Sequence, residues 1–156
     1  MLRKFQYPDT SSDGTLICEW NIGVDIVEIT RFEQLDYSSN KKFYRQIFTP
    51  REIKYCLSFN SPEPHFAANF AGKEAVYKAV NMFCDINLKS IEILRNENGS
   101  PIVNLHLTSA ENVEPLQVKI SLSHSLSHAI AFAIVYKPLK LVNCKGKAEA
   151  RSPHVP

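Results

Sequence analysis

Residues 70–80, FAGKEAVYKAV, constrain the fold more than any other stretch of the chain. Alanines, aromatics and valines give it the composition of a buried helix, yet Lys73, Glu74 and Lys78 lie inside the apolar run. The apolar spacing continues on both sides and predicts a long helix from about residue 65 to residue 82. A helix that is apolar over much of its circumference has to pack against other elements.

Two stripes run along this predicted helix. At about 100° per residue, one stripe carries large side chains and the other, roughly opposite, carries almost none. The large stripe is Phe66, Phe70, Lys73, Tyr77 and Val80, and the small stripe is Ala68, Gly72, Ala75 and Ala79. The small stripe predicts that another backbone approaches the helix closely, either within the chain or across an interface.

Glu74 and Lys78 lie four residues apart between these stripes, so they share one face of the helix. One interpretation is an exposed ion pair that stabilises the helix by about 0.2–0.5 kcal/mol. The other follows from the buried stripes on both flanks, which place the pair in a cleft where acids and bases are useful.

The segments before this helix mix strand and helix signals. Ile22, Val24 and Ile26 alternate with other residues and predict a strand. Residues 29–37 predict a short helix. Thr49-Pro50-Arg51-Glu52 predicts the start of another, with Thr49 as N-cap, Pro50 first and Glu52 third. A loop with two prolines, Pro62 and Pro64, follows.

The segments after the helix predict antiparallel hairpins. SIEILRNENGSPIVNLHL has the pattern of strand, Asn-Gly turn and strand. VKISLSH and AIAFAIVY predict two more strands, joined by a turn at residues 125–128. The fold class is therefore α+β, with antiparallel strands packed on one long helix and shorter helices. We expect residues 1–17 to be a flexible leader, residues 18–137 one domain, and residues 138–156 a flexible tail.

Composition narrows the functional classes. The 156 residues suffice for one domain, with 44% hydrophobic and 22% charged residues and a net charge of +2. A net charge this small gives no reason to expect a nucleic acid or a membrane as partner. No apolar run reaches the roughly 18 residues that a membrane span requires. The four cysteines form no Cys-x-x-Cys pair, so we expect free thiols and a cytoplasmic location.

Asp25 is the second unusual residue, because aspartate is disfavoured in the interior of a strand. It caps the following helix in one interpretation. In the other, Asp25 and Glu74 are paired ligands for Mg²⁺, which takes one or two carboxylates, waters and phosphate oxygens. Gly23, two residues earlier, leaves room beside the carboxylate, and Lys78 would add a positive charge suited to phosphate.

Residues 121–128, SLSHSLSH, repeat Ser-x-Ser-His. They form a simple serine-rich surface turn, or they supply hydroxyl and imidazole groups, such as those of Ser123 and His124, to a phosphate. The chain carries no nucleophile elbow, no GxGxxG and no P-loop.

Taken together, four segments resemble a known family. GVDIVEITRFEQL, FAGKEAVYKA, SIEILRNENGSPIV and VKISLSHSLSHAIAFAIVY occur in the order and spacing of holo-acyl carrier protein synthases, the short form of the 4′-phosphopantetheinyl transferases. The resemblance covers roughly residues 21–137. Its motifs, Gly-x-Asp and Phe-x-x-Lys-Glu-Ala-x-x-Lys-Ala, are specific when they occur together.

The resemblance implies an activity and a partner. Members of the family move the phosphopantetheine arm of coenzyme A onto a serine of apo-acyl carrier protein and release adenosine 3′,5′-bisphosphate, with Mg²⁺ bridging enzyme and pyrophosphate. The short form assembles as a homotrimer with active sites at the interfaces. Its products serve fatty acid or polyketide synthesis, and the sequence does not choose between these pathways.

The resemblance also assigns residues. Asp25 and Glu74 match the metal ligands, Lys78 a lysine near the pyrophosphate, and His124 a residue near the coenzyme A phosphates that a neighbouring subunit often supplies. Arg31 matches an arginine that meets the acidic carrier protein. Glu74, directly or through a metal-bound water, is the candidate base for the serine proton.

The sequence departs from the family pattern at two places, and two other functions remain as alternatives. Asn69 replaces an arginine that many members use for coenzyme A, and NMFCDINLKS replaces the glycine-rich turn after the lysine helix. The rivals are a non-catalytic module of the same fold that binds carrier protein or coenzyme A, and a metal-dependent phosphohydrolase built on the same acidic pair.

Overall fold

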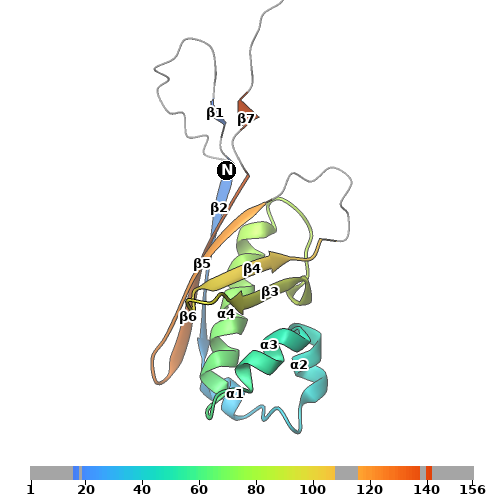
Figure 1. The fold of residues 1–156 in the computed structure, drawn as a ribbon, viewed down its shortest axis with the longest axis vertical. Helices are drawn as coiled ribbons and strands as arrows, with labels where there is room; N and C mark the ends of the chain where they lie inside the picture. Colours follow the sequence, from blue (N-terminus) through green and yellow to red (C-terminus); the bar gives the residue numbers. More distant parts are fainter. Residues whose placement is uncertain (1–15, 18, 108–115, 138–139, 142–156) are drawn as a thin grey trace, which may run out of the picture.

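Helix α4, Glu63–Val80, is the element around which the rest of the chain is arranged (Figure 1). The computed structural model describes residues 16–17, 19–107, 116–137 and 140–141. Within them, α4 contacts a three-stranded sheet, a separate hairpin and two of the short helices. The predicted α+β class, with antiparallel strands packed on one long helix, is confirmed.

The elements follow one another in a simple order. The helices are α1 (Thr30–Glu33), α2 (Lys41–Ile47), α3 (Pro50–Cys56), α4 and the 3₁₀ turn η1 (Leu88–Ser90). The strands are β1 (Leu16–Ile17), β2 (Trp20–Glu28), β3 (Ile91–Arg95), β4 (Pro101–Leu105), β5 (Gln117–His124), β6 (His128–Tyr136) and β7 (Lys140–Leu141).

All strand pairs are antiparallel. The main sheet has the order β2-β6-β5, β3 pairs with β4, and β1 pairs with β7. Most of the predicted leader and tail lies outside the described residues. The two-residue strand β1 lies at the end of the leader, and β7 lies near the start of the tail. Among the helices of the described residues, none is long and apolar enough to cross a bilayer.

Helix α4 meets the main sheet through its small stripe. A Cβ added to Gly23 of β2 would lie 2.0 Å from the carbonyl oxygen of Ala75, so backbone packs directly on backbone there. Nearby, Asn21 Nδ2 donates a hydrogen bond to the carbonyl oxygen of Ala79 at 3.0 Å. Gly72 faces the side chains of β3 and β5. The stripe is therefore used within the chain.

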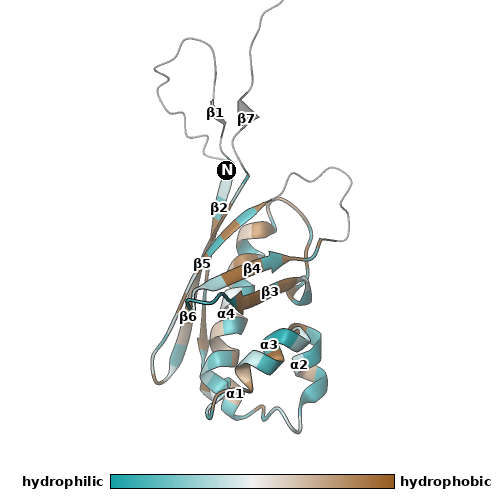
Figure 2. Cartoon of the chain, viewed as in Figure 1, coloured by the Kyte–Doolittle hydropathy of each residue, from teal (hydrophilic) through white to brown (hydrophobic). Residues whose placement is uncertain are grey.

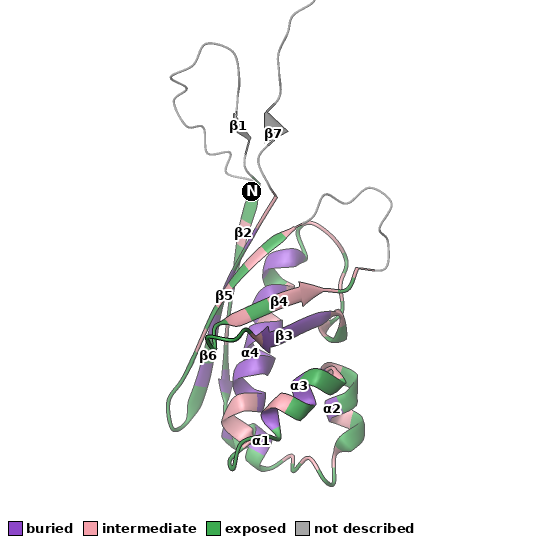
Figure 3. Cartoon of the chain, in the orientation of Figure 1, coloured by how far each residue is buried: buried purple, intermediate pink, exposed green. Residues whose placement is uncertain are grey.

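The two faces of the main sheet differ in burial, and α4 covers only one of them (Figure 3). On β2 and β6, every second residue points away from α4 and is exposed, although many of these residues are hydrophobic (Figure 2). This outer apolar face comprises Trp20, Ile22, Val24, Ile26, Ile130, Phe132 and Ile134. Ile22, Val24 and Ile26 of β2 pair with Ile134, Phe132 and Ile130 of β6, so the face is continuous. A continuous apolar surface of this kind is typical of an interaction site.

Several local predictions are confirmed and others need correction. Thr49 and Glu52 form the predicted capping box, and Gly99 of the β3–β4 turn has φ +82°. The helix predicted over residues 29–37 is only the single turn α1. The long helix begins at residue 63 rather than 65 because Pro64 lies in its first turn, where proline is tolerated, and it ends at residue 80.

Four aromatic rings form the core beneath α1, α2 and α3. Phe66 of α4 contacts Tyr44 at 4.6 Å and Phe48 at 5.3 Å between ring centroids, and it stacks on Phe32 at 6.4 Å. Burial raises the pKa of the Tyr44 hydroxyl to about 12, and that hydroxyl donates to the carbonyl oxygen of Leu35 at 2.7 Å. The aromatic cluster fixes the short helices against the N-terminal half of α4.

A buried ion pair joins α4 to α3 and β3. Lys73 Nζ lies 2.8 Å from Glu52 Oε2, both side chains are fully buried, and Lys73 also donates to the carbonyl oxygens of Leu88 and Ile91. Glu52 additionally accepts the backbone N–H of Ile93 at 2.9 Å. Burial raises the pKa of Glu52 and lowers that of Lys73, and each partner's charge opposes these shifts.

We expect the Lys73→Met and Glu52→Gln variants each to lose about 3–5 kcal/mol of unfolding free energy, because each leaves the other group buried without its partner. The double variant should lose less than the sum of the two. Urea unfolding of all four proteins measures this coupling. Additive losses would show that the pair does not act as a unit.

Candidate active site on helix α4

Asp25 lies on the inner face of β2, between Gly23 and Val27, and points toward α4. Its Oδ1 atom is 2.8 Å from Lys78 Nζ, which also donates to the carbonyl oxygen of Val24 at 3.0 Å. The interpretation of Asp25 as a helix cap is wrong, because it lies within a strand and the N-cap of α1 is Ile29. The space left by Gly23 is filled by the backbone of Ala75.

Glu74 lies on the same side of α4 as Lys78, but the two form no ion pair with each other among the residues described. The interpretation as a simple exposed pair within the helix is therefore wrong, since Lys78 pairs with Asp25 instead. Burial raises the pKa of Glu74, and the charge of Asp25 raises it further, while Lys78 and Arg31 oppose the shift. The Glu74 carboxylate is thus close to another negative group and has no hydrogen-bond partner in the described part of the chain.

Asp25 and Glu74 line one open pocket of about 470 Å³. Arg31 and Phe70 line it too, with the Arg31 guanidinium 4.9 Å from the centre of the Phe70 ring. Four predicted site residues, Asp25, Arg31, Glu74 and Lys78, are therefore brought together by β2, α1 and α4. Of the Glu74 and Lys78 pair that was expected in a cleft, Glu74 lines this pocket and Lys78 does not.

The donor set of this pocket fits a hard divalent cation. The described residues contain no group of three or more His, Cys, Asp or Glu placed to hold a metal by themselves. Mg²⁺ needs no such cage, because it keeps several waters and binds through one or two carboxylates together with substrate phosphates. Burial raises the pKa of Glu74 and the charge of Asp25 raises it further, so a cation beside the two carboxylates would favour their ionised forms. Asp25 and Glu74 would hold the ion.

Ser123 and His124 end strand β5 away from this pocket. Both are exposed, and the described hydrogen bonds of Ser123 include none from its hydroxyl. The His124 ring lies 6.2 Å from the ring of His65, near the start of α4. His65 in turn stacks on Phe59 at 3.5 Å. Within one chain, the predicted phosphate ligands therefore form a second cluster.

The two clusters lie on opposite sides of α4. His65 and Glu74 are nine residues apart, which is about two and a half turns, so their side chains leave the helix in opposite directions. The axial separation is about 13 Å at 1.5 Å per residue. The structure thus places Ser123 and His124 away from Asp25 and Glu74 of the same chain.

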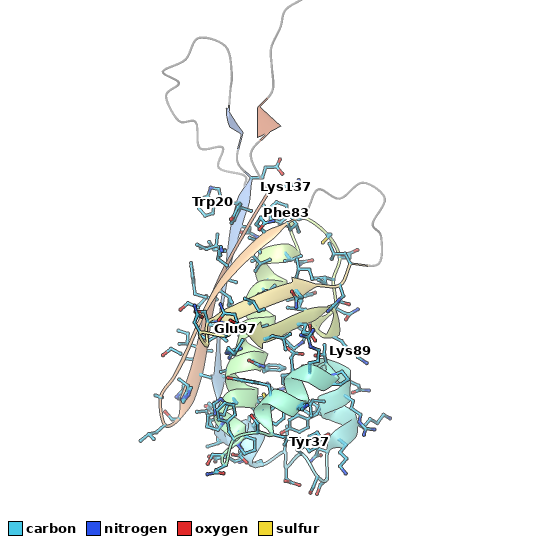
Figure 4. All side chains as sticks on the ribbon, in the orientation of Figure 1. Trp20, Tyr37, Phe83, Lys89, Glu97 and Lys137 are labelled. Atoms are coloured by element: carbon cyan, nitrogen blue, oxygen red, sulfur yellow. The ribbon has the colours of Figure 1, made fainter. Side chains whose placement is uncertain are left out.

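A larger cavity, about 740 Å³, lies between α2, α3 and η1 and contains none of the predicted site residues. Tyr37 and Lys89, labelled in Figure 4, both line it. Its remaining walls are mostly apolar, with Arg45 and Lys54 as further cations. Size alone therefore does not identify the active site, and the acidic pair is found in the smaller pocket.

Sequence reasoning missed three residues near these clusters. Glu28 lines the pocket with Asp25, but it follows Asp25 by only three residues on a strand, a spacing without a recognisable motif. His65 and Arg95 belong to the second cluster, and neither stands in a periodic pattern that points to a ligand. Only their three-dimensional neighbours reveal them.

Comparison with known proteins identifies the class. Residues 21–133 match the model of the 4′-phosphopantetheinyl transferase superfamily, and the chain belongs to this family. Its relatives include the holo-[acyl-carrier-protein] synthase of Clostridium perfringens, 44% identical over 122 residues that cover 73% of this chain and 91% of the relative. The synthase of Thermodesulfovibrio yellowstonii is 38% identical over 114 residues, which cover 73% and 96%.

Solved structures agree with these relatives. A holo-(acyl-carrier-protein) synthase from Bacillus anthracis in complex with CoA (3′,5′-ADP) has a TM-score of 0.60 and 30% identity, covering 76% of this chain and 96% of its own. The Helicobacter pylori synthase in complex with coenzyme A has a TM-score of 0.60 and 28% identity, covering 73% and 98%. The predicted resemblance is confirmed.

We expect the Asp25→Ala and Glu74→Ala variants each to weaken Mg²⁺ binding, measured in the presence of coenzyme A, by more than about 100-fold. Removing a residue that only supports a metal ligand costs about 10- to 100-fold, and removing a ligand itself should cost more. Thermal unfolding should stay cooperative, because neither carboxylate belongs to the core. Calorimetric titration with Mg²⁺ measures the binding. Glu28→Ala is the matched control and should retain most of the affinity. Normal affinity in either test variant would remove that residue from the metal site.

Proposed function

We propose that this chain transfers the 4′-phosphopantetheine arm of coenzyme A to a serine hydroxyl of apo-acyl carrier protein. Adenosine 3′,5′-bisphosphate is the other product. The observation that carries the proposal is that Asp25 and Glu74 line one open pocket, with Lys78 paired to Asp25, in a chain of this superfamily. Two carboxylates with a lysine beside them suit a metal ion and a pyrophosphate.

The reaction requires a base for the serine proton and positive groups that neutralise the charge of the departing bisphosphate. The serine oxygen attacks the phosphorus that bears the pantetheine arm, and the bond from this phosphorus to the bridging oxygen of the pyrophosphate breaks. Glu74 accepts the serine proton, directly or through a water, and its raised pKa suits this role. Phosphoryl transfer otherwise depends on positioning and on neutralising charge.

Lys78 neutralises charge on the departing bisphosphate. In the structure its ammonium group is held by Asp25, which lines the pocket, and by the carbonyl oxygen of Val24. Mg²⁺ bound by Asp25 and Glu74 would supply electrostatic stabilisation of the same phosphates. Positive groups fixed where the charge develops would lower the barrier, and Lys78 is one such group of this chain.

The carrier protein docks near Arg31 in this proposal. Arg31 lines the same pocket as Glu74, so a partner that contacts it can present a serine to the reacting phosphate. Helix α2 adds three basic residues, Lys41, Lys42 and Arg45, and carries no acidic residue. This basic surface complements the acidic carrier protein and favours rapid association.

We also propose that the enzyme works as a homotrimer with shared sites. The outer apolar face of β2 and β6 leaves Ile22, Val24 and Ile26 between 50% and 62% exposed, and contact with other copies would bury it. The two side-chain clusters on opposite sides of α4 support the same arrangement. One coenzyme A reaches Glu74 of one subunit and His124 of the next.

The free thiols of Cys56 and Cys84 are compatible with a reducing cytoplasm, where we place the reaction.

A transfer assay tests the proposed function against both rivals. The purified chain is mixed with coenzyme A, Mg²⁺ and an apo-acyl carrier protein, and the carrier mass and the released bisphosphate are followed. We expect the carrier to gain the mass of phosphopantetheine and the bisphosphate to appear only when the carrier is present. Bisphosphate release without the carrier would indicate a phosphohydrolase, and carrier binding without transfer would indicate a binding module.

Mixing two inactive variants tests the shared sites. Glu74→Ala and His124→Ala should each be nearly inactive, because each damages a different half of a composite site. When the two are unfolded, mixed and reassembled, some interfaces pair two intact halves, so a fraction of wild-type activity should return. Native mass spectrometry identifies assemblies that contain both variants. Such assemblies without activity would place the whole site within one chain.

A further inference from the structure

The cavity between α2, α3 and η1 has no role in the transfer reaction proposed above. Its volume of about 740 Å³ exceeds that of the pocket of Asp25 and Glu74, and it falls within the range of roughly 300–1,000 Å³ that is common for small-molecule sites. In Figure 4, Lys89 lies above α2 and α3 and Tyr37 lies below them, so the cavity runs across both helices. Its volume and its extent suit an elongated small molecule.

Apolar side chains form much of the lining. Phe48 and Ile53 belong to the buried core and also line the cavity. Tyr37 packs edge-on against Tyr44, with the ring centroids 5.3 Å apart. Leu57 extends this surface, although its residue is 41% exposed. A ligand with an apolar body would remove Leu57 from water, which is favourable.

Three cations line the same cavity and come from three different elements. Arg45 belongs to α2, Lys54 to α3 and Lys89 to η1. None of the three forms an ion pair among the residues that the structure describes. None of the described lining residues is an aspartate or a glutamate. Positive charges that share a cavity without a counter-charge repel one another, so an anion bound among them would be attracted by all three.

The frame that carries these cations is held to the core. Lys73 donates a hydrogen bond to the carbonyl oxygen of Leu88 at 3.0 Å, and the backbone N–H of Ser90 donates to Asn87 Oδ1 at 3.0 Å. Both chain neighbours of Lys89 are thus fixed. The capping box described above fixes the first turn of α3 in the same way. The cavity is therefore formed before any ligand arrives, as most ligand sites are.

A second, smaller cavity gives the ligand a direction. It has a volume of about 230 Å³ and adjoins the first at Tyr37 and Leu57, which line both. Two acidic residues, Asp36 and Glu63, line the smaller cavity and would repel an anion there. The anionic end of a ligand therefore belongs at the cations of the larger cavity, and the apolar end points toward Tyr37 and Leu57.

We propose that the larger cavity binds an anionic amphiphile, a single aliphatic chain with a carboxylate or phosphate head group. The head group lies among Arg45, Lys54 and Lys89, and the chain lies on the apolar side chains between the two helices. An aliphatic chain suits a cavity that is long and mostly apolar. The site contains neither Asp25 nor Glu74, so binding there does not depend on the proposed function.

Calorimetric titration of the full chain with sodium octanoate, octyl phosphate and 1-octanol tests the proposal. The three ligands carry the same chain and differ only in the head group. We expect the anion that binds better to bind at least about 10-fold more tightly than the alcohol, because each of three exposed cations contributes up to about 5-fold. The order of the two anions identifies the head group. Lengthening hexanoate to octanoate should tighten binding by up to about 4-fold for each buried CH₂ group.

Variants of the lining separate the head site from the chain site. Arg45→Gln, Lys54→Gln and Lys89→Gln should each weaken the anions by about 2- to 5-fold and leave octanol unchanged. Leu57→Ala should weaken all three ligands. Lys41→Gln is the matched control, because it removes the same charge from α2 at a position outside the lining, and it should retain the affinity of wild type. These side chains are exposed, so thermal unfolding should stay close to that of wild type.

Methyl NMR locates the bound chain and decides between this cavity and the outer apolar face. The anion that binds better should shift the methyl signals of Ile53 and leave those of Ile22 and Ile130 in place. Shifts confined to Ile22 and Ile130 would overturn the proposal. Equal affinity for the anions and the alcohol would overturn it too, as would equal effects of Lys41→Gln and Lys54→Gln or no binding of either anion at millimolar concentration. None of these measurements uses transfer activity, so a failed transfer assay would leave them valid.

Discussion

The close approach of α4 to β2 at Gly23 and Ala75 is the constraint on which the site depends. With any side chain at position 23, the helix would have to move outward, since the added carbon would overlap the Ala75 carbonyl. The distance between the two backbones sets the distance between Asp25, two residues along the strand, and Lys78, three residues along the helix. The same contact that builds the core therefore positions the charged groups of the transferase, and packing and catalysis are not separable in this region.

The chemistry of a polyphosphate explains why a core helix carries charges. Lys73 pairs with Glu52 and donates hydrogen bonds to backbone carbonyl oxygens, so its charge has a structural role. Among the residues that the structure describes, its neighbour Glu74 has no such partners, and burial together with Asp25 disfavours its ionised form. Adjacent residues of one motif thus have opposite roles. The first joins α4 to α3 and β3, and the second keeps a carboxylate available for a cation or a proton.

Local patterns predicted the parts of this fold that depend on short-range physics. The capping box at Thr49, the Gly99 turn and the small stripe of α4 follow from hydrogen bonds or sterics within a few residues. The pairings of Glu52 with Lys73 and of Arg95 with Asn69 were not predictable, because they join residues 21 and 26 positions apart. The alternation in β2 predicted a strand but not its orientation, since the apolar residues Ile22, Val24 and Ile26 face outward and Asp25 faces the helix. The metal role proposed for Asp25 and Glu74 followed first from an aspartate in a strand and a glutamate in an apolar helix and then from the family resemblance, and the structure adds their shared pocket.

The outward orientation of those residues has an explanation in the proposed assembly. A single chain presents Asp25 and Glu74 on one side of α4 and His124 on the other. Contact between copies of the chain would bury the outer apolar face, and it would place His124 of one subunit beside the carboxylates of the next.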